Sequence, residues 1–347
     1  MRRIVTPAPG RLEVARDGGP RPGRGEAKIR VEAAGVAFGD VAWIQGVPLG
    51  PRRPFTPGYD AVGVVEAVGP DVAGLHAGQR VAGLVGRGAW AETVVTDAWR
   101  WVPLPDGLDP RVAACVPLDH LSAWVLLGPL GRVPAGGSIL VHGAGGGLGR
   151  AVLDLTRHMG AEAWGTASEG KRGVVEGYGA HWLPHTPFVG PVRGAGGVDL
   201  AVDHLGGRHL ADSWACLRPH GTLAATSAYR WIRRAHPTRP GGAAGRGRGW
   251  AAGRADGLGL ELAWTARMAG RAALSRRRLR ILDTPGWARR HPVAYRAALA
   301  SLLGLVAEGR LRPRVGSVHP LASAADAVEE VRGAPDGKVL LLPGSDA

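Results

Sequence analysis

The chain has few of the residues that mark a secreted, metal-binding or membrane-spanning protein. Its 347 residues include only two cysteines, Cys115 and Cys216, which lie far apart and fit no metal-ligand motif. No run of 18 apolar residues occurs, and this argues against a membrane span. Residues 1–7 lack the apolar core of a secretion signal. We therefore expect a cytoplasmic protein with no stable membrane insertion.

Lysine is almost absent. Apart from histidine, the basic residues other than Lys28, Lys171 and Lys338 are all arginines. Together with 56 glycines, this bias is typical of a GC-rich genome, so the net charge of +14 does not by itself predict a nucleic-acid partner. No basic motif interleaved with aromatics supports one. We expect no nucleic-acid binding. The charge is uneven, with fifteen arginines and three acidic residues between positions 229 and 290.

The length predicts two domains, and the predicted pattern of secondary structure changes once along the sequence. Up to residue 112, short β-like runs (27–31, 61–68 and 80–85) separated by turn residues predict a small antiparallel barrel or sandwich. From Ser138 onward, predicted strands alternate with helices, which favours a parallel sheet. The predicted strands are 138–142, 161–166, 198–203 and 221–226; a Gly-, Arg- and Pro-rich loop covers 236–257, helices cover 260–282 and 295–308, and a last strand covers 338–342.

The most informative stretch is residues 139–149, which read Ile-Leu-Val-His-Gly-Ala-Gly-Gly-Gly-Leu-Gly. An apolar strand leads into a glycine loop, and the loop leads into a helical pattern. Glycines allow backbone N–H groups to approach a phosphate, and the N-terminus of the following helix favours negative charge. This context predicts binding of a cofactor that contains a diphosphate.

Several segments follow one another in an order that resembles the medium-chain dehydrogenase/reductase superfamily, and within it the zinc-independent quinone oxidoreductase group. These segments are 34–40, 57–65, 77–81, 141–149, 197–207 and 337–341. Residues 165–168 with Lys171, and the ending 338–344, resemble the branch that contains the vesicle amine transport protein. That branch carries extra residues where the basic segment lies.

The resemblance implies a fold of class α/β with a GroES-like β-barrel catalytic domain and a doubly wound Rossmann domain. The barrel domain would comprise residues 1–120 and 291–347, and the Rossmann domain residues 121–290 with the basic segment 229–290 as an insertion. It also implies a homodimer and no bound metal, since Phe38, Gly39 and Tyr59 stand near the two motifs where zinc-dependent relatives need Cys and His.

NADPH is the expected cofactor. NAD-preferring Rossmann domains end the second strand with an acidic residue, whereas here the strand ends at Thr166-Ala167-Ser168 and is followed by Lys171 and Arg172. Hydroxyl groups and cations suit a 2′-phosphate. The alternative is that Lys171 and Arg172 are only the solvated first turn of a helix. The expected cofactor-binding residues are Gly143, Gly146, Gly147, Leu148, Gly149, Thr166, Ser168, Lys171, Arg172, Leu205, Gly206, Thr226 and Lys338.

Four residues are candidates for the chemistry, which would be hydride transfer to an activated C=C bond or a quinone. Asp40 belongs to a motif that faces the nicotinamide in relatives, and Ser122 matches a threonine beside it. Tyr59 presents a phenol, and His120 is a candidate proton donor. The alternatives are a buried carboxylate that accepts backbone N–H bonds for Asp40, an ordinary packed tyrosine for Tyr59 and a hydrogen-bonded core histidine for His120. Asp60 replaces the family glutamate and is expected to be structural.

The chain departs from its apparent family at Ala37, where relatives have Asn, and at Pro48, where they often have Tyr. Both changes make the predicted pocket more apolar. A simple quinone is therefore not the favoured substrate. The resembled group also contains enoyl reductases, which GC-rich bacteria use in secondary metabolism, and this resemblance implies an enone or a quinone-like polyketide as the alternative substrate. The alternatives are a non-redox enzyme, such as a cyclase, or a binding protein that retains the nucleotide site. A further alternative is membrane or polyanion association through residues 229–290.

Overall fold

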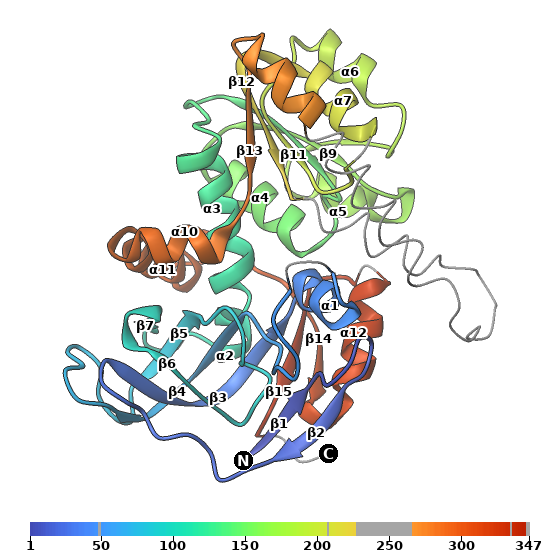
Figure 1. Cartoon of the computed structure of the whole chain (residues 1–347). Coiled ribbons are helices and arrows are strands. Elements are labelled where there is room, and N and C mark those ends of the chain that lie inside the picture. The colour runs from blue at the N-terminus through green and yellow to red at the C-terminus, as the bar shows by residue number, and fades with distance from the viewer. Residues whose placement is uncertain (48–49, 207, 227–265, 334, 345–347) are drawn as a thin grey trace. The chain divides into compact units, whose positions relative to one another are not determined.

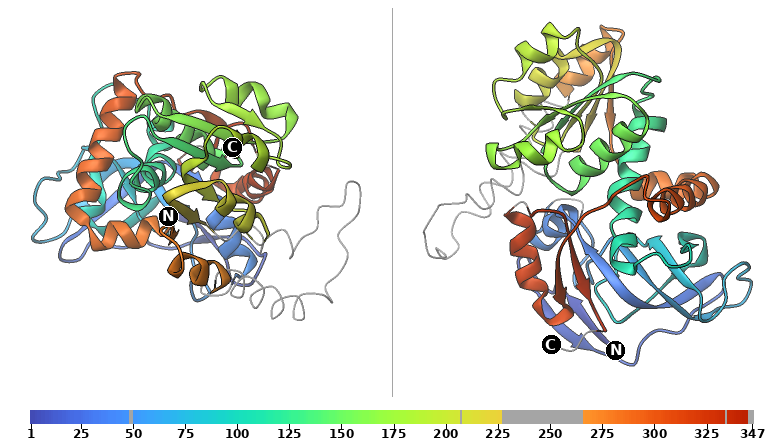
Figure 2. Two further views of the ribbon diagram at one scale, coloured as in Figure 1. Left: turned by 90° about the horizontal axis from the view of Figure 1, so that it is seen from above. Right: turned by 180° about the vertical axis from the view of Figure 1, so that it is seen from behind.

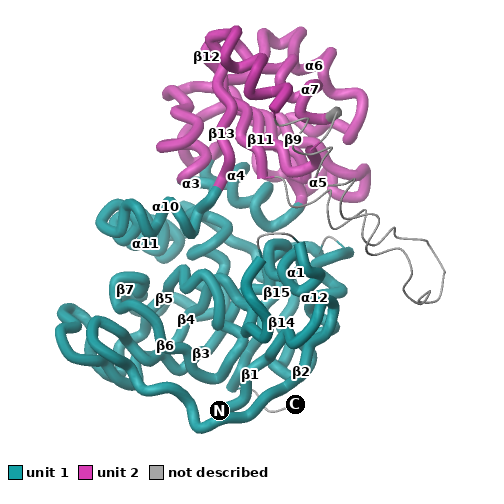
Figure 3. Tube along the Cα trace, viewed as in Figure 1, with its two compact units in different colours: residues 1–124, 146–155, 283–347 teal, residues 125–145, 156–282 magenta. Residues whose placement is uncertain are grey.

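A computed structural model describes residues 1–47, 50–206, 208–226, 266–333 and 335–344. The chain forms two compact units (Figure 3). Unit 1 comprises Met1–Trp124, Gly146–Leu155 and Asp283–Ala347, and unit 2 comprises Val125–Gly145 and Thr156–Leu282. The domain limits expected at residues 120 and 290 stay a prediction. Each unit is described by itself below.

Unit 1 is built around a seven-stranded sheet in the order β14-β15-β3-β4-β5-β7, with β6 paired to β3 (Figure 1). All its pairs are antiparallel except β14 with β15. The strands are β3 (Glu26–Val36), β4 (Asp60–Val68), β5 (Arg80–Leu84), β6 (Thr93–Asp97), β7 (Trp101–Pro103), β14 (Val315–Pro320) and β15 (Lys338–Leu342). The antiparallel pairing predicted for the N-terminal runs is thereby confirmed.

Short helices and a separate hairpin complete unit 1. Strands β1 (Arg2–Val5) and β2 (Glu13–Arg16) pair with each other, and α12 (Ala324–Arg332) packs on β14 and β15 (Figure 2). The other helices are α1 (Phe38–Gln45), η1 (Ala98–Arg100), α2 (Pro110–Ala113), η2 (Val116–His120), α3 (Leu121–Val125), α10 (Thr284–Arg290), α11 (Pro292–Ala307) and η5 (Leu321–Ser323). Tyr295 anchors α11, because its hydroxyl donates to the Arg100 carbonyl at 2.6 Å and accepts the Leu84 N–H at 2.9 Å.

Unit 2 contains a six-stranded sheet in the order β10-β9-β8-β11-β12-β13, with every pair parallel. Its strands are β8 (Ser138–His142), β9 (Glu162–Thr166), β10 (His181–Leu183), β11 (Val198–Asp203), β12 (Leu217–Ala225) and β13 (Arg278–Ile281). Its helices are η3 (Leu126–Leu130), η4 (Glu169–Lys171), α5 (Arg172–Glu176), α6 (Val189–Gly194) and α7 (Arg208–Ala215), and α4 (Gly147–His158) runs from unit 1 into it. The sheet is parallel as predicted, and its apolar side chains, such as Leu140, Phe188 and Leu223, form a buried core.

One predicted element is wrong in part. The sequence predicts a helix over residues 260–282, but helix is present only at 266–273 within the described part of that range, and Arg278–Ile281 forms strand β13. The alternation Arg-Leu-Arg-Ile suits an edge strand, and pairing with β12 overrides the local helical preference. Residues 260–265 and the predicted loop at 236–257 lie outside the described residues.

Among the described residues, one continuous helical run, Pro110–Leu130, is long and apolar enough to cross a membrane by length and composition alone. Two thirds of its apolar stretch (67%) is buried inside the protein, as it would be in a core helix. The run therefore gives only weak support for membrane insertion.

Candidate functional site

The glycine loop follows β8 and needs glycine at two positions within unit 2. Gly143 has a φ of +59°, and a Cβ there would lie 2.4 Å from Cε1 of His204. A Cβ at Gly145 would lie 2.4 Å from Cδ of Lys171. The Ala144 N–H between them donates to the Thr166 carbonyl at 3.0 Å, so the loop is tied to the end of β9. Glycine at both positions therefore allows the side chains of His204 and Lys171 to pack directly on the loop backbone.

Helix α4 begins at Gly147, and its first turn contains the predicted Leu148 and Gly149. The hydrogen bond from the Arg150 N–H to the Gly146 carbonyl, at 2.9 Å, closes that turn. The N–H groups of a first turn have no carbonyl within the helix to bind, and they favour a negative charge. Within unit 1, the carboxylate of Asp119 lies against this point, since a Cβ at Gly147 would be 2.8 Å from its Oδ2.

Lys171, from the turn after β9, lies on the glycine loop. Its ammonium donates to the Gly145 carbonyl at 3.2 Å. Ser168 is exposed at the start of the same turn, and no acidic residue ends β9. Arg172 is also exposed, but its guanidinium donates to Glu176 at 2.8 Å and stacks on Trp182. These contacts favour a cofactor role for Ser168 and Lys171 and a helix-surface role for Arg172.

The remaining predicted cofactor residues of unit 2 are organised by Asp203 at the end of β11. One carboxylate oxygen of Asp203 accepts the N–H groups of Leu205 and Gly206, both at 2.9 Å, and its carbonyl accepts the Thr226 N–H at 2.9 Å. Thr166 is fully buried, and its hydroxyl lies 2.9 Å from Nδ1 of His142. The Thr166 side chain is therefore directed into the protein rather than toward a ligand.

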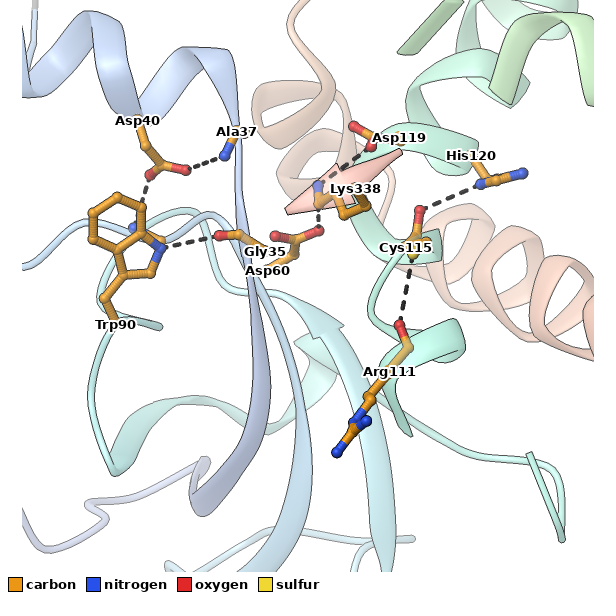
Figure 4. Close-up of polar contacts among 11 residues, drawn as sticks. Gly35, Ala37, Asp40, Asp60, Trp90, Arg111, Cys115, Asp119, His120 and Lys338 are labelled. Atoms are coloured by element: carbon orange, nitrogen blue, oxygen red, sulfur yellow. Dashed lines mark hydrogen bonds and ion pairs between the residues drawn. The ribbon is translucent and has the colours of Figure 1, made fainter. Parts of the chain in front are cut away.

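Lys338, the last predicted cofactor residue, lies in a buried ionic cluster of unit 1 (Figure 4). Its ammonium lies 3.3 Å from Oδ2 of Asp60 and 3.4 Å from Oδ2 of Asp119. Burial alone would lower the pKa of Lys338, but the carboxylates of Asp119 and Asp60 outweigh burial and raise it. Gly35 leaves room for the pair, since a Cβ there would be 2.3 Å from Asp60 Oδ1. The cluster favours a structural role for Asp60, as expected, and also for Lys338.

Asp40 and Tyr59 lie close to the same region of unit 1. Asp40 is fully buried, and its two oxygens accept the N–H groups of Ala37 at 2.9 Å and Gly58 at 2.8 Å (Figure 4 shows the Asp40–Ala37 contact). Burial raises the pKa of Asp40 to about 7, although both hydrogen bonds oppose the shift. Tyr59 stacks on Trp43 with ring centroids 4.4 Å apart, and burial first, then the Asp40 and Asp283 carboxylates, raise its pKa. Asp40 thus matches the structural alternative, while Tyr59 retains a protonated phenol.

His120 and Ser122 are both buried in unit 1. The two ring nitrogens of His120 face acceptors, the Cys115 carbonyl at 3.3 Å and the Asp154 carboxylate at 3.4 Å (the Cys115 contact appears in Figure 4). The Ser122 hydroxyl lies 2.7 Å from that of Thr284. This geometry favours the core-histidine interpretation of His120, and the four catalytic assignments stay predictions.

The sequence interpretation did not identify Asp119, His142, Ser213 or Asp203, whose contacts reach the loops described above. His142 and Asp203 carried a usable signal, because each ends a strand immediately before a predicted cofactor loop. Asp119 and Ser213 carried none, since their partners are distant in sequence. The basic segment lies outside the described residues from 229 to 265, and so does Pro48.

The described residues do not fit a zinc site. Cys115 is buried, which raises the pKa of its thiol, and its sulfur contacts the Arg111 carbonyl at 3.6 Å (Figure 4). Cys216 belongs to the other unit. Within the described ranges, no group of three or more His, Cys, Asp or Glu side chains could hold a metal ion.

Comparison with known proteins identifies two family profiles. The profile of the alcohol dehydrogenase GroES-like domain matches residues 23–106, and that of the zinc-binding dehydrogenases matches residues 185–341. Rat synaptic vesicle membrane protein VAT-1 homolog is 31% identical over 337 residues, which cover 94% of this chain and 79% of the relative. The mouse VAT-1 homolog-like protein is 35% identical over 64% of this chain, and the matched part is only 55% of that relative. The spectinabilin polyketide synthase system protein NorB of Streptomyces orinoci is 38% identical over 57% of this chain and 9% of its own length.

Solved structures agree with these matches. A mycobacterial protein in complex with NADPH superimposes with a TM-score of 0.80 at 26% identity, over 99% of this chain and all of the other (100%). The quinone oxidoreductase of Thermus thermophilus, also solved with NADPH, gives a TM-score of 0.75 at 27% identity, again over 99% of this chain and 100% of that one. The predicted fold class and the family resemblance are thereby confirmed.

Proposed function

Because the chain belongs to the VAT-1-like, zinc-independent branch of the medium-chain dehydrogenase/reductase superfamily, we propose that it is an NADPH-dependent reductase. Its substrate would be an activated C=C bond of an enone or enoyl compound, or a quinone. The relatives solved with NADPH support the cofactor, and the match to a polyketide synthase protein supports a role in secondary metabolism. Cytoplasmic location and a homodimer belong to the same proposal.

The observation that carries this proposal is the position of Lys171. Its ammonium lies 3.2 Å from the Gly145 carbonyl of the glycine loop, in a turn that follows β9 without an acidic residue at the strand end. A cation and the exposed hydroxyl of Ser168 suit a 2′-phosphate, whereas a carboxylate at this point would suit a free ribose hydroxyl.

The chain would contribute binding and orientation. NADPH, when bound, supplies the hydride. Within unit 2, the glycine loop after β8 would hold the diphosphate, and Ser168 with Lys171 would hold the 2′-phosphate. The phenol of Tyr59 remains protonated, and Tyr59 is the least buried of the four candidate catalytic residues, so it would be the residue that donates a proton to the reduced substrate.

The test is a tryptophan fluorescence titration with NADPH and NADH in parallel. We expect tighter binding of NADPH and at least about tenfold weaker NADPH binding in Lys171→Ala, as for loss of a charge-assisted contact. Lys28→Ala is the matched control, because Lys28 pairs with Glu66 at 3.0 Å on β3 of unit 1. Arg172→Ala should change the affinity less than Lys171→Ala. Equal NADPH affinity in Lys171→Ala and wild type would contradict the cofactor assignment.

NADPH oxidation with a panel of enones and quinones tests the reaction itself. Turnover with an enone but not with simple quinones would match the apolar Ala37 in the predicted pocket segment. Tight cofactor binding without oxidation across the whole panel would favour the alternative, a non-redox protein that retains the nucleotide site.

A further inference from the structure

Unit 2 buries a chain of polar side chains beneath the loops that the proposed function assigns to the cofactor. The Thr166 hydroxyl lies 2.9 Å from Nδ1 of His142, Nε2 of His142 lies 2.9 Å from the Ser213 hydroxyl, and that hydroxyl lies 2.7 Å from Oδ2 of Asp203. All four side chains are at most 1% exposed. Their hydrogen bonds therefore cannot be exchanged for water without local opening.

The hydrogen bonds that link Thr166, His142, Ser213 and Asp203, a set of side chains called the relay below, all run in one direction. Asp203 accepts from the Ser213 hydroxyl, so the oxygen of Ser213 is left to accept the Nε2–H of His142. Nδ1 of His142 then carries no proton and accepts the hydroxyl of Thr166. Each donor has one acceptor, and this arrangement fixes both the tautomer and the ring orientation of His142.

The relay reaches both loops that the proposed function assigns to the cofactor, namely the glycine loop after β8 and the turn after β11. Thr166, His142 and Asp203 are the last residues of β9, β8 and β11, which are neighbours in the sheet. His142 directly precedes Gly143, and the second oxygen of Asp203 holds the N–H groups of Leu205 and Gly206. In open parallel sheets, ligands bind at this carboxyl edge of the strands.

We infer that His142, Ser213 and Asp203 are positioning residues for the dinucleotide, which together hold the glycine loop after β8 and the turn after β11 in one arrangement. The inference rests on the proposed function for the identity of the ligand. Ser213 is the central member, because its hydroxyl bonds to both the histidine and the carboxylate, whose own closest atoms are 4.0 Å apart.

The surroundings of His142 keep its imidazole neutral. Burial lowers the pKa of His142 to about 4; Asp203 opposes this shift, whereas His204, His209 and His185 reinforce it. The Phe188 ring packs edge-on against the imidazole, with centroids 4.8 Å apart. The relay requires a neutral imidazole, since protonation of Nδ1 would remove the acceptor for the Thr166 hydroxyl.

The experiment compares Ser213→Ala with a control at the amino-terminal ends of the same strands, opposite the ends that carry the relay. Asp199 accepts the Ser138 N–H and an Arg218 guanidinium N–H, both at 2.9 Å, near the start of β8 and β11. Asp199→Asn therefore weakens a partly exposed ionic network of the same strands, away from the cofactor loops. His142→Gln, which keeps an N–H donor near Nε2, serves as the conservative variant.

Two readouts are taken on the full-length protein: hydrogen exchange of segments 143–149 and 204–206 without ligand, and the Kd for NADPH. For Ser213→Ala we expect exchange in both segments to be about tenfold faster and the Kd about tenfold higher, since one donor and one acceptor lose their partner. His142→Gln, which keeps a donor for the Ser213 oxygen, should change both readouts less than Ser213→Ala does. Asp199→Asn should lower the Tm while leaving both readouts within about twofold of wild type.

The outcomes separate the relay from the proposed function. Unchanged exchange and unchanged Kd in Ser213→Ala would overturn the relay while the reductase proposal stands. Equal loosening in Asp199→Asn would also overturn it, because the network would then be general sheet support. If the wild-type protein binds neither NADPH nor NADH, the proposed function fails, and the exchange data alone decide whether the relay holds the loops.

Discussion

Units 1 and 2 bury polar side chains in two different ways. In unit 1, the ammonium of Lys338 lies between the carboxylates of Asp60 and Asp119, so opposite charges face each other at 3.3 and 3.4 Å. In unit 2, His142 and Ser213 link Thr166 to Asp203 through hydrogen bonds that each have a defined donor and acceptor. The first cluster depends on charge balance and the second on geometry.

The difference determines what a substitution leaves behind. Loss of a partner from a buried ionic cluster leaves an uncompensated charge, which is among the most unfavourable states in a protein interior. Loss of the Ser213 hydroxyl leaves one donor and one acceptor without that partner, but Asp203 keeps its bonds from the Leu205 and Gly206 N–H groups, so the loss of stability is smaller. The ionic cluster should therefore influence folding most strongly, and the relay should influence loop position with a smaller loss of stability.

Lys338→Met gives the largest expected effect. It removes the cation and leaves the carboxylates of Asp60 and Asp119 facing each other, so the free energy of unfolding should fall by about 3–5 kcal/mol. Urea unfolding followed by tryptophan fluorescence measures this loss.

The matched control for this change is a triple variant. Adding Asp60→Asn and Asp119→Asn to Lys338→Met removes the charges together, and it should recover a large part of the lost stability. If the single and triple variants unfold at the same urea concentration, the cluster is not held by charge balance.

Gly35→Ala comes next, because it adds one methyl group to the same cluster. Its Cβ would lie 2.3 Å from Asp60 Oδ1 and 2.6 Å from Lys338 Cε, so the ion pair must shift. Overpacking of this kind lowers stability by about 1–3 kcal/mol. Thermal unfolding of Gly35→Ala beside Gly304→Ala tests the prediction, since Gly304 lies in helix α11 with no atom near the added Cβ. Equal melting temperatures would contradict it.

The two units should also respond to pH with opposite signs. The pKa of Asp40 in the folded protein, about 7, lies above its ordinary value of 3.8, so its stabilising contribution is complete below pH 3.8 and lost as the pH rises through 7. The pKa of His142, about 4, lies below its ordinary value of 6.5, so its contribution is present above pH 6.5 and lost as the pH falls through 4.

Asp40→Asn isolates the response of unit 1. An amide offers one acceptor to the N–H groups of Ala37 and Gly58, so we expect lower stability at every pH but a smaller decline from pH 5 to pH 8. The difference in slope is at most about 1.4 kcal/mol per pH unit for one proton. Thermal unfolding across this range measures it, and parallel curves for variant and wild type would refute the assignment to Asp40.

Local pattern was sufficient to predict much of the fold. Strands at 138–142 and 198–203 have the predicted bounds because each is a short apolar run between turn residues, and a buried parallel strand needs little more. The glycine loop and Lys171 were predictable for the same reason, since the strand, loop and helix are contiguous. Strand β13 was not, because Arg278–Ile281 becomes a strand only by pairing with β12, where Arg278 lies opposite Thr222.

The partners of the site residues were beyond local pattern. Ser213 lies 71 residues from His142, and Lys338 lies 278 residues from Asp60, so no spacing connects them. The family motif suggested a catalytic role for Asp40, and residue type suggested one for His120, but only burial and hydrogen-bond partners show that both are tied to the protein interior. Sequence thus predicts which loops are candidates for cofactor binding, while the contacts that hold those loops require the folded chain.

Thr166→Val has the smallest expected effect. It tests whether a substitution at the end of the relay raises the Kd for NADPH less than one at its centre, Ser213. Valine keeps the shape of the side chain but removes the hydroxyl that donates to Nδ1 of His142, so one neutral acceptor is left without a partner. The links from His142 through Ser213 to Asp203 remain, and the Thr166 carbonyl still accepts the Ala144 N–H. We expect a loss of about 1 kcal/mol in unfolding free energy and a smaller rise in the Kd for NADPH than in Ser213→Ala. An equal rise in the two variants would mean that the end of β9, rather than the link to Asp203, sets the position of the glycine loop.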